Sequence, residues 1–253
     1  MNPTTLLPKL EAIARRAGEV ILEVYRGDFD ARSKADASPV TEADERAELV
    51  IVAALRALTP GIPVVAEEEV ARGACPAVGA EFWLVDPLDG TKEFISRNGE
   101  FTVNIALIRD GAPLLGVVLA PALGRLFSGA VGVGAELEDA GGRRRIAVRD
   151  VPADGLTVVG SRSHGDAAAL DAFLGGRKVA ALSAAGSSLK FCLVAAGEAD
   201  LYPRLGRTME WDIAAGHAVL AAAGGQVTTL AGAPMRYGKP GFENPHFVAS
   251  GRA

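Results

Sequence analysis

Two aspartates follow an apolar run in the first half of the chain. Residues 82–85 are apolar, Asp86 and Asp89 come soon after them, and Gly90 and Thr91 follow. The apolar run predicts a buried strand, and the glycine and threonine predict the start of a helix. Carboxylates at a strand end can bind a hard cation, and the N–H groups of a helix start can bind phosphate. The segment therefore predicts metal-dependent phosphate chemistry.

Other acids stand beside apolar segments elsewhere in the sequence. Asp44 lies at an expected helix start, residues 67–69 are three glutamates after a short strand, and Asp212 follows a tryptophan. If these groups meet Asp86 and Asp89, their mutual repulsion calls for a divalent cation. The donors are all oxygens, which favours Mg²⁺ or Mn²⁺ over Zn²⁺. Taken singly, each acid is more often a surface group or a helix cap.

Helices and an antiparallel sheet are expected in the first half. Apolar residues recur at helical spacing over 6–24, and Thr41 with Asp44 has the pattern of a capping box for a second helix that stops at Pro60. Alternating residues and turn signals predict strands at 63–66, 101–107, 114–119 and near 126–130, with a hairpin turn at 110–111. This half therefore predicts two or three helices on an antiparallel sheet.

Strands and helices alternate in the second half. The expected strands are 156–159, 179–182, 200–202 and 226–229, and the expected helices are 167–174, 187–196 and 213–223. Such alternation predicts an α/β layer sandwich. Because no flexible linker is visible, we expect one compact unit with two subdomains. The first, residues 1–152, carries the acidic motif, and the second, residues 153–253, carries Asp212.

Composition and charge disfavour several classes of protein. The 253 residues are 49% hydrophobic, enough for a full core, and the net charge is −5. A nucleic-acid binder would normally be basic, and we interpret the single basic run, 143–145, as a solvated hairpin end. Cys75 and Cys192 have neither disulfide nor zinc spacing, which favours a reducing cytoplasm. No signal-peptide or membrane-spanning pattern is found, and peripheral attachment to the inner membrane stays open.

Loops of the second half carry groups that suit a phosphorylated substrate. The candidates follow a strand end or precede a helix: Ser161, Arg162, His164, Gly186, Ser187, Lys190 and Arg204. Arg162 and His164 could meet a second phosphate or a base, but a polar loop with a satisfied histidine is an equally good interpretation. Lys190 could likewise be an exposed residue of an ordinary helix start. His217, on an alanine-rich segment, is expected to pack rather than to catalyse.

Several motifs together resemble one known family. Residues 86–91 read Asp-Pro-Leu-Asp-Gly-Thr, inside longer similar segments at 83–95 and 97–106. Further matching segments are 33–36 with 38–41, 161–164, 186–192, 201–204 and 211–218. On these residues the chain resembles the lithium-sensitive inositol monophosphatase superfamily, and within it the bacterial bisphosphate nucleotidases. The resemblance covers nearly the whole chain.

The resemblance implies a layered α-β-α-β-α sandwich and a Mg²⁺-dependent phosphatase of sulfur metabolism. The implied reaction removes the 3'-phosphate of adenosine 3',5'-bisphosphate to give AMP, with 3'-phosphoadenylyl sulfate as an open second substrate. The implied ligands of two or more Mg²⁺ ions, or of Mn²⁺, are Glu67, Asp86, the Leu88 carbonyl, Asp89 and Asp212. The register inside 67–69 is left open.

The same resemblance implies the catalytic and binding roles. Asp44 and Thr91 would activate the attacking water beside Glu67. The substrate would contact, besides the loop candidates, the following groups of the acidic motif: Glu67, Leu88, Asp89, Gly90, Thr91 and Asp212.

Two rival interpretations remain at this point. The first is an inositol monophosphatase or a fructose-1,6-bisphosphatase of the same superfamily, which would share the metal site. The second is a non-enzymatic scaffold that senses nucleotide or metal or binds a protein. The intact set of acids together with Thr91 favours an enzyme. A homodimer is left open.

Overall fold

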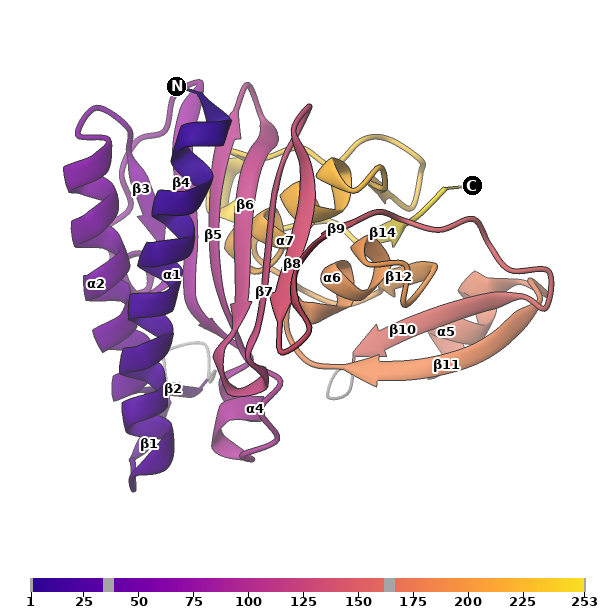
Figure 1. Cartoon of the computed structure of the whole chain (residues 1–253), viewed down its shortest axis with the longest axis horizontal. Helices are drawn as coiled ribbons and strands as arrows, with labels where there is room; N and C mark the ends of the chain where they lie inside the picture. Colours follow the sequence, from indigo (N-terminus) through magenta and orange to yellow (C-terminus); the bar gives the residue numbers. More distant parts are fainter. Residues whose placement is uncertain (1, 34–38, 162–166, 253) are drawn as a thin grey trace.

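The computed structural model describes residues 2–33, 39–161 and 167–252, and it arranges them in alternating layers of helices and sheets (Figure 1). Helices α1 (Pro3–Arg26) and α2 (Glu42–Leu58) pack together on a seven-stranded sheet. Its strand order is β3 (Val64–Ala66), β4 (Glu81–Asp89), β5 (Thr102–Arg109), β6 (Ala112–Ala120), β7 (Arg125–Ala130), β8 (Gly134–Asp139) and β9 (Gly142–Ile146). The β3–β4 pair is parallel, so the sheet that was expected to be antiparallel is mixed.

Alternate residues of the first sheet point into two different cores. Trp83 and Val85 of β4 pack with the buried faces of α1 and α2. Leu84, between them, packs with residues of α6 (Leu189–Ala195) and α7 (Glu210–Ala222) on the other side. Because successive strand side chains face opposite sides, a sheet covered on both faces needs near-continuous apolar strands.

A five-stranded sheet forms the next layer. Its order is β11 (Val179–Ala185), β10 (Leu156–Ser161), β12 (Leu201–Arg204), β14 (Phe247–Ser250) and β13 (Gln226–Thr229). Val158 and Leu201 pack with α5 (Ala167–Leu174) on one face. Val159 and Tyr202 pack with α6 and α7 on the other face. The α-β-α-β-α sandwich expected from the sequence is therefore confirmed.

Short elements are where the structure adds to the prediction. The elements without a sequence signal are β1 (Ala31–Ser33), β2 (Pro39–Thr41), α3 (Glu67–Ala71), β8, β9, β14 and two 3₁₀ turns, Pro121–Leu123 and Pro240–Phe242. Such segments are too short to show a period. Helix α7 begins at Glu210, earlier than the expected 213, so Asp212 lies inside its first turn. The capping box at Thr41 and Asp44 is confirmed.

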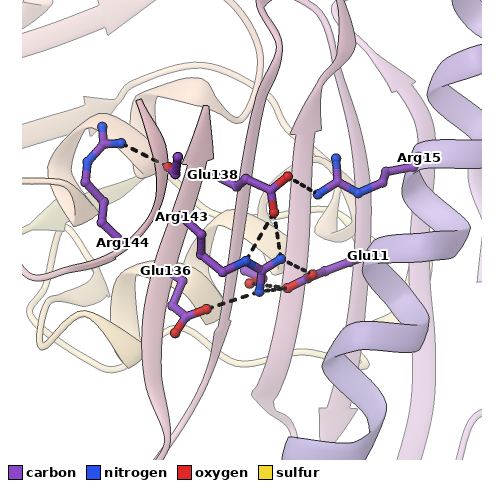
Figure 2. Close-up of polar contacts among 8 residues, drawn as sticks. Glu11, Arg15, Glu136, Glu138, Arg143 and Arg144 are labelled. Carbon is purple, nitrogen blue, oxygen red and sulfur yellow. Dashed lines mark hydrogen bonds and ion pairs between the residues drawn. The ribbon is translucent and has the colours of Figure 1, made fainter. Parts of the chain in front are cut away.

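An ion-pair network ties β9 to α1 (Figure 2). The guanidinium of Arg143 binds the buried carboxylate of Glu11 with both terminal nitrogens, and Ser128 Oγ donates to the same carboxylate at 2.8 Å. Arg143 also contacts Glu136 at 3.1 Å and Glu138 at 2.8 Å. The basic run 143–145 is thus an exposed edge strand, as its polarity suggested, but Arg143 is paired rather than merely solvated.

The two cysteines are free thiols, Cys75 exposed and Cys192 buried. Among the helices described, none combines the length and the apolar composition that a bilayer crossing requires.

Candidate active site

Acids from separate segments line one cleft of about 830 Å³. Asp86 and Asp89 lie at the end of β4, Glu67 begins α3, and Asp212 is in the first turn of α7. The cleft wall includes residues of the seven-stranded and of the five-stranded sheet. The acids that the sequence scatters along the chain are therefore brought together here.

The end of β4 is shaped to present both aspartates. Pro87 cannot donate a ladder hydrogen bond, and the pairing with β5 shifts register between Asp86 and Asp89. Asp86 Oδ1 accepts the Leu88 N–H at 3.0 Å, which closes a local turn. Gly90 follows with φ 92°, and a Cβ there would lie 3.3 Å from the Ser187 Cβ. Glycine therefore permits both the turn and the close approach of the loop at 187.

The acids of the cleft disturb one another electrostatically. Burial raises the pKa of Asp86 well above its usual value, and the carboxylates of Glu67, Asp89 and Asp212 raise it further. Burial also raises the pKa of Asp212, with Asp89 and Glu67 adding to the effect. The pKa of Asp89 rises to about 6 through burial, although the nearby Lys190 ammonium opposes this shift. Burial, together with mutual repulsion, thus makes these three carboxyls resist ionisation.

The three adjacent glutamates point to different surroundings. Glu67 lies beside Asp86 in the cleft. The Glu68 side chain is buried, and its backbone N–H donates to Glu48. Glu69 pairs with Arg56, at 2.8 and 3.1 Å from the same guanidinium nitrogen. Of the three glutamates, Glu67 is the one whose charge and hydrogen bond act on Asp86.

A threonine–aspartate pair lies beside the acids. Thr91 Oγ1 lies 3.2 Å from Asp44 Oδ1, as a donor to that carboxylate. The other carboxylate oxygen, Oδ2, accepts the Thr41 N–H at 2.8 Å and the Thr41 hydroxyl at 2.7 Å. Asp44 is 2% exposed, so Thr41 fixes the direction in which it meets Thr91. The helix that begins at Thr91, α4 (Thr91–Ile95), is a single short turn.

Lys190 is buried, so the interpretation of an exposed lysine is wrong. Its Nζ donates to the carbonyls of Ser187 at 2.6 Å and Ala185 at 3.1 Å. Burial lowers its pKa to about 8, although the Asp89 carboxylate works in the other direction. Gly186 does not line the cleft; its N–H donates to Glu100 at 2.9 Å. The cleft therefore has one buried ammonium close to Asp89.

Two buried polar atoms at the cleft have no hydrogen-bond partner in the described part of the chain. They are Ser187 Oγ and Arg204 Nε. Ser187 also has φ 44°, a left-handed conformation that is rare for a residue other than glycine. Buried polar atoms are normally paired, so these two suit contact with a polar ligand. Strained backbone of this kind is common at binding sites.

Most of the expected site residues meet at this cleft. Ser161, Ser187, Lys190 and Arg204 line it together with the acidic motif. Arg162 and His164 lie outside the described residues. His217 is buried and its Nδ1 is 2.9 Å from the Tyr237 hydroxyl, which agrees with a packing role.

Some residues at the site escaped the sequence argument. Asn104 Nδ2 reaches Asp89 Oδ2 at 3.4 Å, the Glu93 charge contributes to the raised pKa of Asp89, and Tyr202 forms part of the wall. The first-turn position of Glu93 after the motif was a signal that could have found it.

The donor chemistry of the cleft suits a hard divalent cation. The candidate ligands are carboxylate and carbonyl oxygens, and three of the acids have raised pKa values that a cation would reverse. Within residues 2–33, 39–161 and 167–252, no three histidine, cysteine, aspartate or glutamate side chains form a ready-made metal cage. The arrangement is thus an open acidic cleft that fits a cation sharing its ligands with water and substrate.

Comparison with known proteins agrees with this geometry. The inositol monophosphatase family matches residues 2–250. The 3'(2'),5'-bisphosphate nucleotidase CysQ of Escherichia coli strain K12 is 51% identical over 248 residues, 97% of this chain and 99% of that protein. The CysQ of Buchnera aphidicola subsp. Acyrthosiphon pisum is 41% identical over 250 residues, 97% of this chain and 93% of that protein.

Solved structures show the same similarity. The crystal structure of CysQ from Bacteroides thetaiotaomicron superposes with a TM-score of 0.81 at 38% identity, covering 98% of each chain. The inositol monophosphatase from Anabaena gives a TM-score of 0.77 at 28% identity, covering 99% of this chain and 92% of the other. On its sequence, its layers and its acidic cleft, the chain belongs to the inositol monophosphatase family.

Proposed function

We propose that this chain is a metal-dependent 3'(2'),5'-bisphosphate nucleotidase that removes the 3'-phosphate of adenosine 3',5'-bisphosphate. The observation that carries the proposal is the acidic cleft with the Thr91–Asp44 pair beside it. The curated relatives at 51% and 41% identity are named for this activity. 3'-Phosphoadenylyl sulfate, which carries the same 3'-phosphate, is the second substrate we propose.

Glu67, Asp86, Asp89 and Asp212, with the Leu88 carbonyl, would hold Mg²⁺. Mg²⁺ is commonly bound by one or two carboxylates, water and substrate phosphate, which agrees with an open cleft rather than a cage. When bound, the ions would supply Lewis acidity to a water molecule and offset the negative charge of the phosphate. Mn²⁺, with similar ligand preferences, is the expected substitute.

Thr91 and Asp44 would act together as the base. The Thr91 hydroxyl gives its hydrogen to Asp44 Oδ1, so its oxygen lone pairs are left to accept a hydrogen bond from a water molecule. Proton movement from water to Thr91 and from Thr91 to Asp44 would then generate the nucleophile. Thr41 holds the second oxygen of Asp44 and so keeps the pair aligned.

The cationic side of the cleft would bind the rest of the nucleotide. Arg204, Ser187 and Lys190 line the same cleft as the acids. An unpaired donor on Arg204 and an unpaired hydroxyl on Ser187 suit the oxygens of a second phosphate. A substrate with one phosphate would leave them unsatisfied, which disfavours it.

A substrate panel tests the proposal. Phosphate release is measured with Mg²⁺ on adenosine 3',5'-bisphosphate, inositol 1-phosphate and fructose 1,6-bisphosphate. We expect kcat/KM to favour the nucleotide by about tenfold or more, EDTA to abolish turnover and Li⁺ to inhibit it. Asp89→Asn protein prepared in parallel controls for contaminating phosphatases. Preference for either sugar phosphate, or turnover that survives EDTA, would overturn the proposal.

A further inference from the structure

Helix α3, which presents Glu67 to the cleft, is too short to be stable without contacts from the rest of the fold. It spans only Glu67–Ala71, and its N-cap residue, Ala66, offers no side-chain hydrogen bond. Helices of this length are unstable in isolation, so contacts with the rest of the fold must fix its position. The direction of the Glu67 carboxylate therefore depends on whatever holds α3.

The buried carboxylate of Glu48, on α2, accepts hydrogen bonds from both ends of α3. Glu48 Oε2 accepts the backbone N–H of Glu68 at 2.7 Å, in the first turn of α3. Glu48 Oε1 accepts from Arg72 Nη2 at 2.8 Å, and Arg72 is the residue that follows α3 at its C-terminal end. Glu48 thus supplies the cap that Ala66 lacks and anchors the far end as well.

The burial of Glu48 indicates that its carboxylate has a structural role. It is 2% exposed, on the face of α2 that carries apolar core residues. A carboxylate there is costly to bury, and an apolar residue of similar size would pack without that cost. Asp44, which holds Thr91, lies one helical turn before Glu48 on the same helix. Two carboxylates of α2 therefore hold residues at the cleft: Asp44 binds Thr91, and Glu48 binds α3.

We propose that Glu48 is a positioning residue that sets the Glu67 carboxylate for cation binding. The inference rests on the proposed function, since it assigns Glu67 to the cation site. Glu48 itself acts through α3, by way of the Glu68 N–H and Arg72. Loss of its carboxylate lets α3 shift, which weakens the cation site and leaves the Thr91–Asp44 pair in place.

Mn²⁺ binding to the full-length protein tests this directly, by electron paramagnetic resonance or calorimetry. Glu48→Ala should weaken Mn²⁺ affinity about tenfold or more, the usual range for residues that orient a ligand. Glu48→Gln keeps one acceptor but no charge, so it should weaken affinity about threefold, between Glu48→Ala and wild type. In phosphate release, the metal concentration for half-maximal rate should rise while kcat at saturating metal changes less.

Arg56→Met is the matched control. Arg56 also joins α2 to α3, through Glu69, but the Arg56 side chain is exposed and the pair does not cap the helix. Arg56→Met should bind Mn²⁺ within about twofold of wild type. Folding of each variant is checked by circular dichroism, and Glu48→Gln decides the matter if Glu48→Ala does not fold.

The outcomes separate the two proposals. Folded Glu48 variants that bind Mn²⁺ as wild type does would overturn the positioning role. Equal weakening by Arg56→Met would overturn it too, because general loosening of α3 would then suffice. A wild-type protein that binds Mn²⁺ but hydrolyses no bisphosphate would overturn the nucleotidase proposal alone.

Discussion

Buried like charges dominate the cleft at the scale of single residues. Burial raises the pKa of Asp89, Lys190 opposes that shift, and Glu67 and Glu93 reinforce it. The charge of Asp89 is therefore only partly balanced by the protein around it. A bound cation would neutralise the remaining negative charge of Asp89. Replacing Asp89 with a neutral residue would remove that charge.

Neutralising Asp89 should stabilise the metal-free protein while it abolishes turnover. The folded-state pKa of about 6 lies above the ordinary 3.8, so the fold favours the neutral, protonated carboxyl. Its contribution to stability is fully present below about pH 4, where it matches that of a neutral amide, and is lost as pH rises through 6. In EDTA at pH 7.5, urea unfolding should give Asp89→Asn a free energy of unfolding higher than that of wild type by on the order of 1–3 kcal/mol. At pH 4 the two proteins should differ little in this free energy. A variant less stable than wild type at pH 7.5 would contradict the repulsion argument.

Thr91 should matter for turnover and hardly at all for cation binding. Thr91→Val removes the hydroxyl that reaches Asp44 and keeps the side-chain shape. We expect kcat to fall by about 10² or more, the usual range for loss of general-base assistance, while Mn²⁺ affinity stays within about twofold. Thr91→Ser, which keeps the hydroxyl, is the control and should retain most of the rate. Phosphate release and Mn²⁺ titration measure the two quantities.

Edge strands and short helices are held by side chains from distant elements. The β9 strand is exposed along its length, and Arg143 anchors it to Glu11 of α1, as Figure 2 shows. Helix α3 is held in a similar way by Glu48. In both cases a buried carboxylate on a long helix fixes an element that local propensity alone would leave weak.

Removing Arg143 should destabilise the protein without affecting catalysis. Arg143→Leu leaves the Glu11 carboxylate, 6% exposed, without its main counter-charge. We expect the free energy of unfolding to fall by roughly 2 kcal/mol, less than for a fully buried pair because Arg143 is partly exposed. None of the residues labelled in Figure 2 lines the cleft, so kcat per folded molecule should not change.

Arg144→Leu is the control on the same strand. Arg144 pairs with Asp139 at 2.7 Å near the surface, where solvent screening leaves such a pair little effect on stability. Urea unfolding of the two variants gives the comparison. Equal losses for both would mean that burial of Glu11 is not the reason.

The seven-stranded and the five-stranded sheet share one core. That core contains Leu84 and Val118 of the first sheet, Val159 and Phe247 of the second, and the helices between them. Helix α7 lies in this shared layer and brings Asp212 to the acids of β4. We therefore propose that the subdomains 1–152 and 153–253 are two halves of the chain that share one hydrophobic core.

Neither half should fold alone. Fragments 1–152 and 153–253 would each expose the apolar face that the other half covers, and exposed patches of this size favour aggregation. We expect each fragment to lack dispersed amide signals in NMR spectra, and the intact chain to unfold in one cooperative step. A well-folded fragment 1–152 would show that the first subdomain is independent.

Local signals in the sequence predict most of the long elements and the chemistry of the site. Helical spacing over 6–24, the capping box at Thr41 and the alternation in 101–107 are local signals, and local backbone physics follows them. Asp86 and Asp89 supply the charge and Gly90 permits the turn, so the motif and its family are recognisable from the sequence alone.

Which groups meet depends on the packing of distant elements. Glu67 rather than Glu69 faces Asp86, Lys190 is buried, and Glu48 holds α3, because each depends on how α2, α3 and α7 pack around the end of β4. Charge repulsion, burial and register act through space between residues far apart in the chain. A sequence pattern reports only near neighbours, so it could name Glu67, Asp86 and Lys190 but could not place them together, and Glu48 carried no signal at all.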